Sequence, residues 1–332
     1  MTHPDPRRSP AVRRRPAIRL VPAVAALFLF AACSPAGGDL GGVATPPPTS
    51  EPSLQVPSSE PTPGPSRAPG SPEPSGLPPS GPPTSGTIVR AYFFLGSFTT
   101  TAGLAPVLRE VPETVAVGAA AMNALLAGPN EAELSASPAM YTAVPNGSRF
   151  LGLRIEGGIA IVNLSREFES GGGSASVLGR LAQVVYTLTQ FPTVEGVQFE
   201  LDGTPITVFS GEGVMLDKPL TRADYTDQLP PIWVDRPAWG GVLGNPARVT
   251  GLANVFEAAF QVAILDGSGK TLTDEHVMAS CGTGCWGTFD VTLPYANGTA
   301  QWGTLRVYDF SARDGSPENV RDYPVWLIPG GP

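Results

Sequence analysis

The feature that most restricts the fold is a long stretch of proline, serine, glycine and threonine from Ser34 to Gly86. It has few apolar side chains, so it buries too little surface to offset the entropy lost on ordering, and we expect it to be disordered. Its prolines favour extended polyproline II geometry, which suits a tether over residues 33–86. Folded structure must therefore come from the remaining chain, about 245 residues, enough for two domains.

The chain before this stretch has the pattern of an export signal. Arginines lead into an apolar run from Leu20 to Ala32, which together describe a secretory signal peptide over residues 1–32. The run is shorter than the roughly 20 residues that a membrane-spanning helix needs. Cys33 follows two alanines, as in the bacterial lipobox that this stretch resembles, with Phe30 at the usual leucine position.

The lipobox resemblance implies that Cys33 is diacylated and becomes the new N-terminus. It also implies an extracytoplasmic protein, anchored to the outer face of the cell membrane through that lipid. A signal peptide that contains a cysteine without being lipidated stays open as the alternative.

Charge limits the partners of the exported chain. Residues 1–32 hold six arginines and one aspartate, and without them the totals of 21 basic and 29 acidic side chains become 15 and 28. This acidic chain repels nucleic acid and anionic lipid, so we expect neither as a partner. Membrane attachment is therefore expected from the acyl chains on Cys33.

Apolar spacing predicts an α+β domain over residues 87–213. Strands and helices follow in the order β-α-β-β-α-β, which predicts two helices on one face of a small sheet. Glu156-Gly157-Gly158 marks a hairpin turn between the middle strands. The predicted elements are strands at 88–95, 150–155, 159–164 and 197–201 and helices at 114–127 and 174–189, the second capped by Ser174.

A second, all-β domain is predicted over residues 230–330, after a polar linker at 214–229. Seven short strands separated by turn residues, without a helical segment, favour an immunoglobulin-like sandwich. Because the linker is polar, we expect two cooperative units, which proteolysis would separate after removing the tether. The predicted strands lie at 232–235, 248–253, 257–265, 271–279, 287–293, 304–310 and 323–327.

Motifs in both domains resemble a known pair of modules. Residues 125–129, 144–148, 162–168 and 182–191 resemble the GerMN domain, named after a sporulation and germination lipoprotein. Residues 245–251, 253–258, 284–289 and 314–316 resemble Gmad2, an immunoglobulin-like module found beside GerMN. The first resemblance implies a fold like that of ring-building modules in secretion and sporulation assemblies. Together they imply an envelope lipoprotein that binds or scaffolds, and they carry over no catalytic residue.

The residues themselves form no catalytic or metal-binding pattern. After residue 32 the chain has one histidine, His276, which argues against a Ser-His-Asp or Cys-His site. Cys281 and Cys285 face an oxidising compartment, and with His276 they lack the spacing of zinc ligands. We expect the two cysteines to be bridged across a hairpin, with ~2 kcal/mol of stabilisation from the short loop. The prediction is no enzyme, no metal and no cofactor.

Three other patterns have simple explanations. The acid pairs Glu131 with Glu133 and Asp224 with Asp227 are interpreted as solvated surface charge rather than as a glycosidase site. The G-x-G-x-x-G match at 282–287 precedes a predicted strand, whereas a dinucleotide loop opens a helix. Glycines 171–173 could expose N–H groups to an anion at a helix start, but a flexible loop explains them as well.

The expected function is that of a non-enzymatic, lipid-anchored envelope protein that binds a protein partner in an extracytoplasmic assembly. The candidate surface lies beside the predicted hairpin, near Arg154, Arg166 and Glu167, because a sheet face or edge without helices is free to meet a partner. Two alternatives stay open. One is a cell-wall glycan module that uses Trp239 or Trp302. The other is a cell-wall enzyme or its regulator, such as an accessory factor of a wall hydrolase, with the first domain acting on peptidoglycan.

Overall fold

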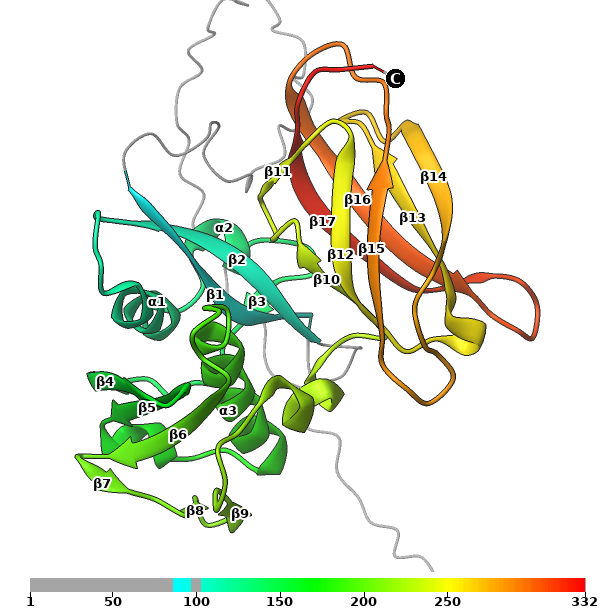
Figure 1. Ribbon diagram of the computed structural model, residues 1–332. Helices are drawn as coiled ribbons and strands as arrows, with labels where there is room; N and C mark the ends of the chain where they lie inside the picture. Colours follow the sequence, from blue (N-terminus) through cyan, green and yellow to red (C-terminus); the bar gives the residue numbers. More distant parts are fainter. Residues whose placement is uncertain (1–85, 97–102, 332) are drawn as a thin grey trace, which may run out of the picture. The chain divides into compact units, whose positions relative to one another are not determined.

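The computed structural model describes residues 86–96 and 103–331 (Figure 1). The predicted signal peptide, Cys33 and most of the tether lie outside these residues. All described residues belong to one compact unit. Within them, no helix is both long enough and apolar enough to cross a membrane.

The N-terminal domain has two helices between two sheets (Figure 1). Its helices α1 (Val117–Leu126) and α3 (Ser174–Leu188) both contact β1 of the first sheet, and they contact β4 and β6 of the second. The first sheet consists of β2 (Gly103–Val111), β1 (Thr87–Leu95) and β3 (Met140–Tyr141). The second consists of β4 (Phe150–Glu156), β5 (Ile159–Leu164), β6 (Gly196–Leu201) and β7 (Thr204–Pro205).

The predicted order of strands and helices is confirmed, but the expected single sheet is wrong. The reason is β2, which the sequence pattern did not reveal. It pairs antiparallel with the whole of β1, from Thr87 opposite Val111 to Leu95 opposite Gly103. Because β1 is paired in this way and also with β3, it forms a sheet of its own on the other side of the helices.

Helix α3 is buried on nearly every side, as a helix between two sheets must be. Residues from Gly179 to Leu188 are all buried, including the polar Gln183 and Thr187. Gln183 satisfies its amide by donating from Nε2 to the Tyr92 carbonyl and accepting at Oε1 from the Ala143 N–H. The predicted cap by Ser174 is wrong. Gly173 is the N-cap, and the Ser174 hydroxyl instead donates a hydrogen bond to the Glu212 carboxylate at 2.5 Å.

The glycine-rich loop before α3 surrounds a buried cation. The guanidinium of Arg180, whose side chain is 1% exposed, donates to the carbonyls of Phe168, Ser170 and Gly171 at 2.7–2.8 Å. Gly171 and Gly172 have φ of +63° and +78°, which a residue with a side chain rarely adopts. The loop therefore turns its carbonyl oxygens inward, so its backbone offers no support for an anion site.

The C-terminal domain is a sandwich of two sheets, as predicted. All seven predicted strands are present, and one short strand is added. The smaller sheet consists of β10 (Ile232–Arg236), β12 (Ala247–Ala253) and β15 (Gly287–Leu293). The larger consists of β11 (Val242–Leu243), β17 (Pro317–Leu327), β16 (Gln301–Phe310), β13 (Ala259–Leu265) and β14 (Thr271–Met278).

Short elements complete the chain and connect the sheets. They are α2 (Glu131–Leu134), β8 (Val208–Phe209) and β9 (Val214–Met215), with 3-10 turns η1 (Arg166–Glu169), η2 (Arg222–Gln228) and η3 (Phe256–Ala258).

Cys281 and Cys285 form the predicted disulfide, with Cα atoms 5.9 Å apart. The expected hairpin is wrong, because the loop from β14 to β15 that holds them connects the two sheets of the sandwich. Gly287 is required here, because a Cβ on it would clash with the backbone of Cys281. The G-x-G-x-x-G match lies in this same loop and leads into β15, which confirms that it is not a dinucleotide motif. His276 is exposed on β14, as expected for a surface strand histidine.

The linker between the domains is packed rather than exposed. Four of its apolar side chains are buried: Leu216, Leu220, Tyr225 and Leu229. In η2, the guanidinium of Arg222 lies over the rings of Tyr92 and Tyr186 of the first domain, at 5.4 and 4.8 Å from their centroids. It also lies 5.9 Å from the ring of Trp233, at the start of the second domain.

Polar contacts join the two domains directly. Arg321 of β17 is buried and donates from Nη2 to the carbonyls of Leu95 and Gly103 at 2.9 and 3.0 Å. Asp235 of β10 pairs with Arg90 of β1 at 3.1 Å. The expectation of two independent cooperative units does not fit this packing, because neither domain can separate without exposing buried charge and aromatic surface.

Candidate functional site

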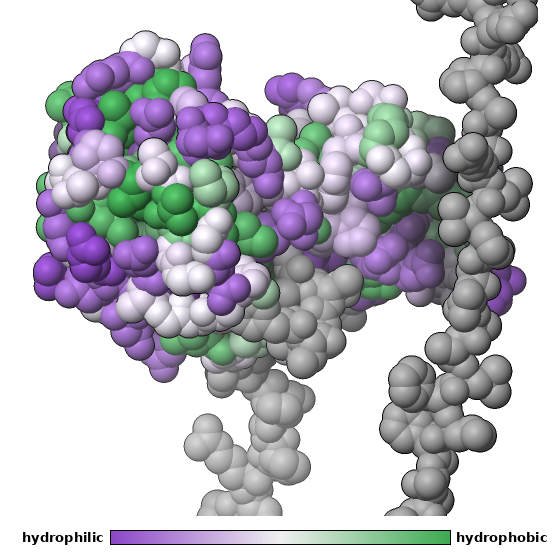
Figure 2. All heavy atoms as spheres, turned by 90° about the horizontal axis from the view of Figure 1, so that it is seen from below, coloured by the Kyte–Doolittle hydropathy of each residue, from purple (hydrophilic) through white to green (hydrophobic). Residues whose placement is uncertain are grey.

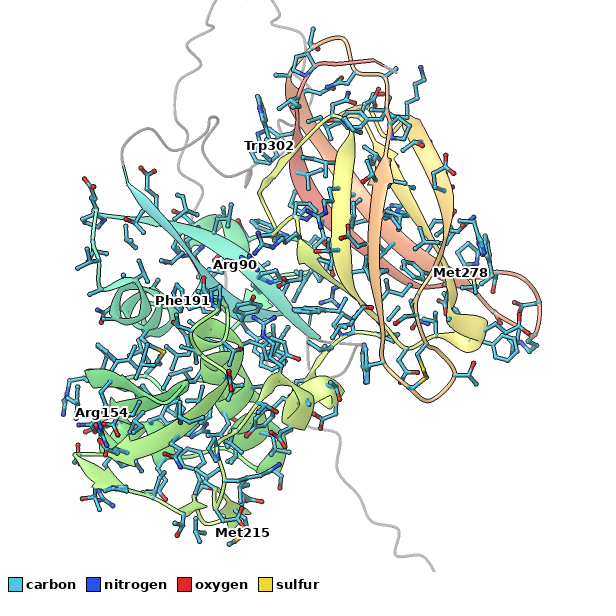
Figure 3. All side chains as sticks on the ribbon, in the orientation of Figure 1. Arg90, Arg154, Phe191, Met215, Met278 and Trp302 are labelled. Carbon is cyan, nitrogen blue, oxygen red and sulfur yellow. A yellow bond between two sulfur atoms is a disulfide. The ribbon has the colours of Figure 1, made fainter. Side chains whose placement is uncertain are left out.

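The structure does not bring the three predicted binding residues into one site. Arg154 lies on β4 opposite Ile161 of β5, close to the hairpin turn (Figure 3). Arg166 and Glu167 lie in η1, beyond the other end of β5. Both are exposed and ion-paired within the chain: Arg166 with Asp202 at 3.6 Å, and Glu167 with Arg149 at 3.8 Å.

Arg154 is held by two carboxylates of its own domain. Its Nη1 and Nη2 donate to Glu200 at 2.9 and 2.8 Å, and its Nε donates to Glu156 at 2.9 Å. Hydrogen bonds from Arg154 hold the pKa of the nearly buried Glu200 below its usual value. A charge reversal at Arg154 would therefore set one carboxylate against two others, so it would test stability rather than partner binding.

We expect this pair to make stability depend on pH on the acid side. Because the pKa of Glu200 is lowered by folding, ionised Glu200 stabilises the fold above its unfolded pKa near 4.5, and this contribution is lost as the pH falls through the folded pKa. Thermal unfolding from about pH 6 to about pH 3 should show a steeper loss of Tm in the wild type than in Arg154→Gln. The exposed Arg166→Gln should keep the wild-type slope, and equal slopes in all three chains would contradict the prediction.

An apolar groove of about 490 Å³ opens between α1, β4 and the loop that follows α3. Val115 is fully exposed at its rim, and Ile155 is 48% exposed. Gly118 allows α1 to approach β4 closely, since a Cβ on it would lie 2.7 Å from Leu153 Cδ2. Apolar side chains line most of the groove: Val115, Val117, Leu153, Ile155, Leu188, Phe191 (Figure 3), Pro192 and Val194.

One wall of this groove is a free sheet edge. β4 pairs with β5 on one side, and no strand among the described residues pairs with its other side (Figure 1). Leu151 is 46% exposed where a bulge interrupts the pairing between Phe150 and Gly152. Hydrophobic residues also gather in a patch on the N-terminal domain in the space-filling view (Figure 2). We call β4 with its neighbouring groove the β4 edge.

The β4 edge is the site that sequence reasoning missed. The sequence analysis placed the candidate surface beside this hairpin but named charged residues there, and not the apolar Leu151, Leu153 and Ile155. The usable signal lay in Val115 and Phe191, large apolar residues just outside the two helices. A large apolar residue just beyond the end of a helix is less easily buried by the domain's own core.

Among the described residues, no cluster of metal-binding side chains lies at this edge. Among residues 86–96 and 103–331 there is no group of three or more His, Cys, Asp or Glu side chains that could hold a metal ion. The interpretation of Glu133 as solvated charge is wrong. Its carboxylate is buried, accepts from Arg109 Nη1 at 2.6 Å, and closes the N-cap of α2 at the Asn130 N–H.

The two tryptophans considered for glycan contact differ in the structure. Trp239 is buried, and its backbone N–H donates to the Pro106 carbonyl in the other domain, so a glycan-facing role for it is wrong. Trp302 is half-buried on β16 and meets Trp326 edge to face, with ring centroids 5.3 Å apart (Figure 3).

Comparison with solved structures finds low identity to GerMN proteins. The first GerMN domain of the sporulation protein GerM from Bacillus subtilis is 18% identical and covers 42% of this chain and 99% of its own, with a TM-score of 0.34. The tandem GerMN domains of the same protein are 13% identical and cover 63% of this chain and 62% of theirs, with a TM-score of 0.36. TM-scores this low support no argument about this chain. No curated protein matches it.

Family models match both domains and agree with the resemblances seen in the sequence. The first, described as sporulation and spore germination, matches residues 90–207. The second, described as an immunoglobulin-like domain of bacterial spore germination, matches residues 231–316. The chain therefore carries a Germane domain followed by a Gmad2 domain, both from sporulation and germination families.

Proposed function

We propose that this chain is a non-enzymatic, lipid-anchored envelope protein whose Germane domain binds protein at the β4 edge. The observation that carries the proposal is the free side of β4 beside an apolar groove. A free strand edge offers a row of backbone donors and acceptors to which another strand can add. Main-chain hydrogen bonds then supply affinity, and a neighbouring pocket for alternate side chains supplies specificity.

The apolar character of the groove supports a protein partner over a polar ligand. Leu151 and Ile155 are large apolar residues that stand about half exposed on one strand. Covering them with apolar side chains stabilises a complex by about 25 cal/mol per Å² of surface removed from water. The acidic charge of the exported chain favours neither nucleic acid nor anionic lipid as the occupant.

The edge is tested by affinity purification of the full chain from the native envelope. Ile155→Asp places a charge within the proposed contact, and it should reduce recovery of partner proteins roughly tenfold or more, since a loss of 1.4 kcal/mol is tenfold. Val208→Asp is the matched control, because Val208 lies on β8 of the same domain and is also 48% exposed. Equal recovery with Ile155→Asp and the wild type, with an untagged copy of the chain counted among the partners, would refute the proposal.

The lipid anchor is a separate part of the proposal, and it lies outside the described residues. Cys33→Ser should move the chain from the membrane fraction to the soluble exported fraction, because the acidic domains offer no other attachment to an anionic membrane. Fractionation with immunodetection measures this. Retention of the variant in membranes at the wild-type level would contradict the anchor.

A cell-wall module is the second candidate, and Trp302 beside Trp326 is the observation that favours it. An aromatic ring that is partly exposed can stack against a sugar. In that case the chain would co-sediment with purified cell wall, and Trp302→Ala would reduce the bound fraction. Co-sedimentation that is equal for both chains would exclude these rings as the contact.

A further inference from the structure

The turn of the β4–β5 hairpin decides which backbone groups of β4 face outward. Its two glycines have φ of +56° and +84°, and Glu156 pairs with Ile159 across them, which defines a two-residue hairpin turn. In such a turn the Glu156 carbonyl accepts from the Ile159 N–H. Because hydrogen-bonded and non-hydrogen-bonded pairs alternate along an antiparallel ladder, Leu153 and Ile155 direct their N–H and C=O groups away from β5.

The sequence of β4 is complementary to itself about Leu153. If a second copy of β4 runs antiparallel with its Leu153 opposite Leu153, then Ile155 of each copy lies opposite Leu151 of the other, the residue at the bulge that ends the regular part of β4. These apolar residues are the ones left about half exposed on β4. The pair at the centre is one in which both residues direct backbone groups outward, as an antiparallel hydrogen-bonded pair requires.

The side chains on the other face of β4 are also compatible with this register. Gly152 lies opposite Arg154 of the second copy, and a Cβ placed on Gly152 would meet nothing within 4 Å in the chain. Because Gly152 has no side chain, Arg154 can keep its hydrogen bonds to Glu200 and Glu156. A register centred on Arg154 would instead set two guanidinium groups opposite each other, which is unfavourable. Charge therefore selects the register centred on Leu153.

We propose that the occupant of the β4 edge is a second copy of this chain, paired antiparallel about a two-fold axis at Leu153. This inference rests on the proposed function of the same edge and names its partner. The contact joins the two four-stranded sheets into one and uses the same surface on both copies, as two-fold dimers do. It brings Leu151, Leu153 and Ile155 of the two copies into one apolar stripe.

The symmetry of this contact allows a specific test by cysteine cross-linking of the full chain in its native membranes. Cα atoms of a hydrogen-bonded antiparallel pair lie about 5.5 Å apart, within the range of a disulfide. Leu153→Cys should therefore form a covalent dimer under mild oxidation. Ile155→Cys alone should not, because Ile155 of the two copies would lie four residues out of register, about 13 Å along the strand.

A mixture of two variants checks the register independently of Leu153, whose side chain packs on the core. Chains with Leu151→Cys and chains with Ile155→Cys, expressed together, should cross-link to each other more than either does alone. The wild type, oxidised in the same way, measures any linkage through Cys33. Absence of both the Leu153→Cys dimer and the mixed dimer would overturn the proposal, as would equal cross-linking of Ile155→Cys alone.

These outcomes are distinct from failure of the proposed function. If Ile155→Asp abolishes recovery of a different protein while no cross-linked dimer forms, the edge binds protein but the partner is not a second copy. If Ile155→Asp does not reduce the recovery of any partner and no cross-linked dimer forms, the proposed function fails as well. A Leu153→Cys dimer that forms at the expected register supports both.

Discussion

Replacing Trp233 by alanine should lower the free energy of unfolding by about 3–5 kcal/mol, the usual cost of removing a large buried aromatic side chain. Trp233 is 2% exposed and begins the second domain on β10. Its ring meets Tyr186 of α3 edge to face, with centroids 5.5 Å apart. The substitution therefore opens a cavity at the contact between the domains rather than inside one of them.

Chemical denaturation followed by circular dichroism and fluorescence measures this effect. We expect the wild type to unfold in one transition, because linker and domains share buried contacts, and Trp233→Ala to separate the transitions of the two domains. Trp302→Ala is the matched control, since Trp302 is half-buried on the outer face of β16. A wild-type chain that unfolds in two transitions would show that the domains are independent.

Replacing Arg180 by methionine should cost about 3 kcal/mol, because buried groups left without a partner cost 1–3 kcal/mol each. The variant keeps most of the side-chain volume but removes the donors to the carbonyls of Phe168, Ser170 and Gly171. Burial lowers the pKa of the guanidinium, and the surrounding carbonyl oxygens offset the loss of water around it.

Thermal unfolding of Arg180→Met and of Arg149→Met separates this effect from the loss of a surface charge. Arg149 has a side chain that is 67% exposed and pairs with Glu167 at 3.8 Å, so its replacement should cost less than about 1 kcal/mol. Similar losses in the two variants would mean that the loop before α3 does not depend on Arg180.

The elements that could be predicted from the sequence are those with strong periodicity and clear turns. Glu156-Gly157-Gly158 located the β4–β5 hairpin, and the period change after the linker located the sandwich. β2 was missed because its sequence, with Pro106 in the middle and charges near the end, does not alternate. The separate sheet that it forms with β1 therefore could not be predicted.

The candidate site was predicted only in part, for a related reason. The sequence placed the candidate surface near Arg154, Arg166 and Glu167, and the structure pairs all three within the chain. Pairing of this kind depends on register between distant strands, as with Arg154 and Glu200 of β6. The polar linker was misleading in the same way, because Leu220 is buried where it pairs with Val197 of β6, and Tyr225 is buried in η2.

The claim that the β4 edge binds protein is tested most directly by hydrogen exchange of the Leu153 and Ile155 amides. In the dilute, purified full chain these outward N–H groups should exchange rapidly, because no described strand pairs with them. In the assembly recovered from the envelope they should be protected by roughly tenfold or more. Amides on β14, which is also an edge strand, should be unchanged. Equal exchange of Leu153 and Ile155 in the free chain and in the assembly would contradict the claim.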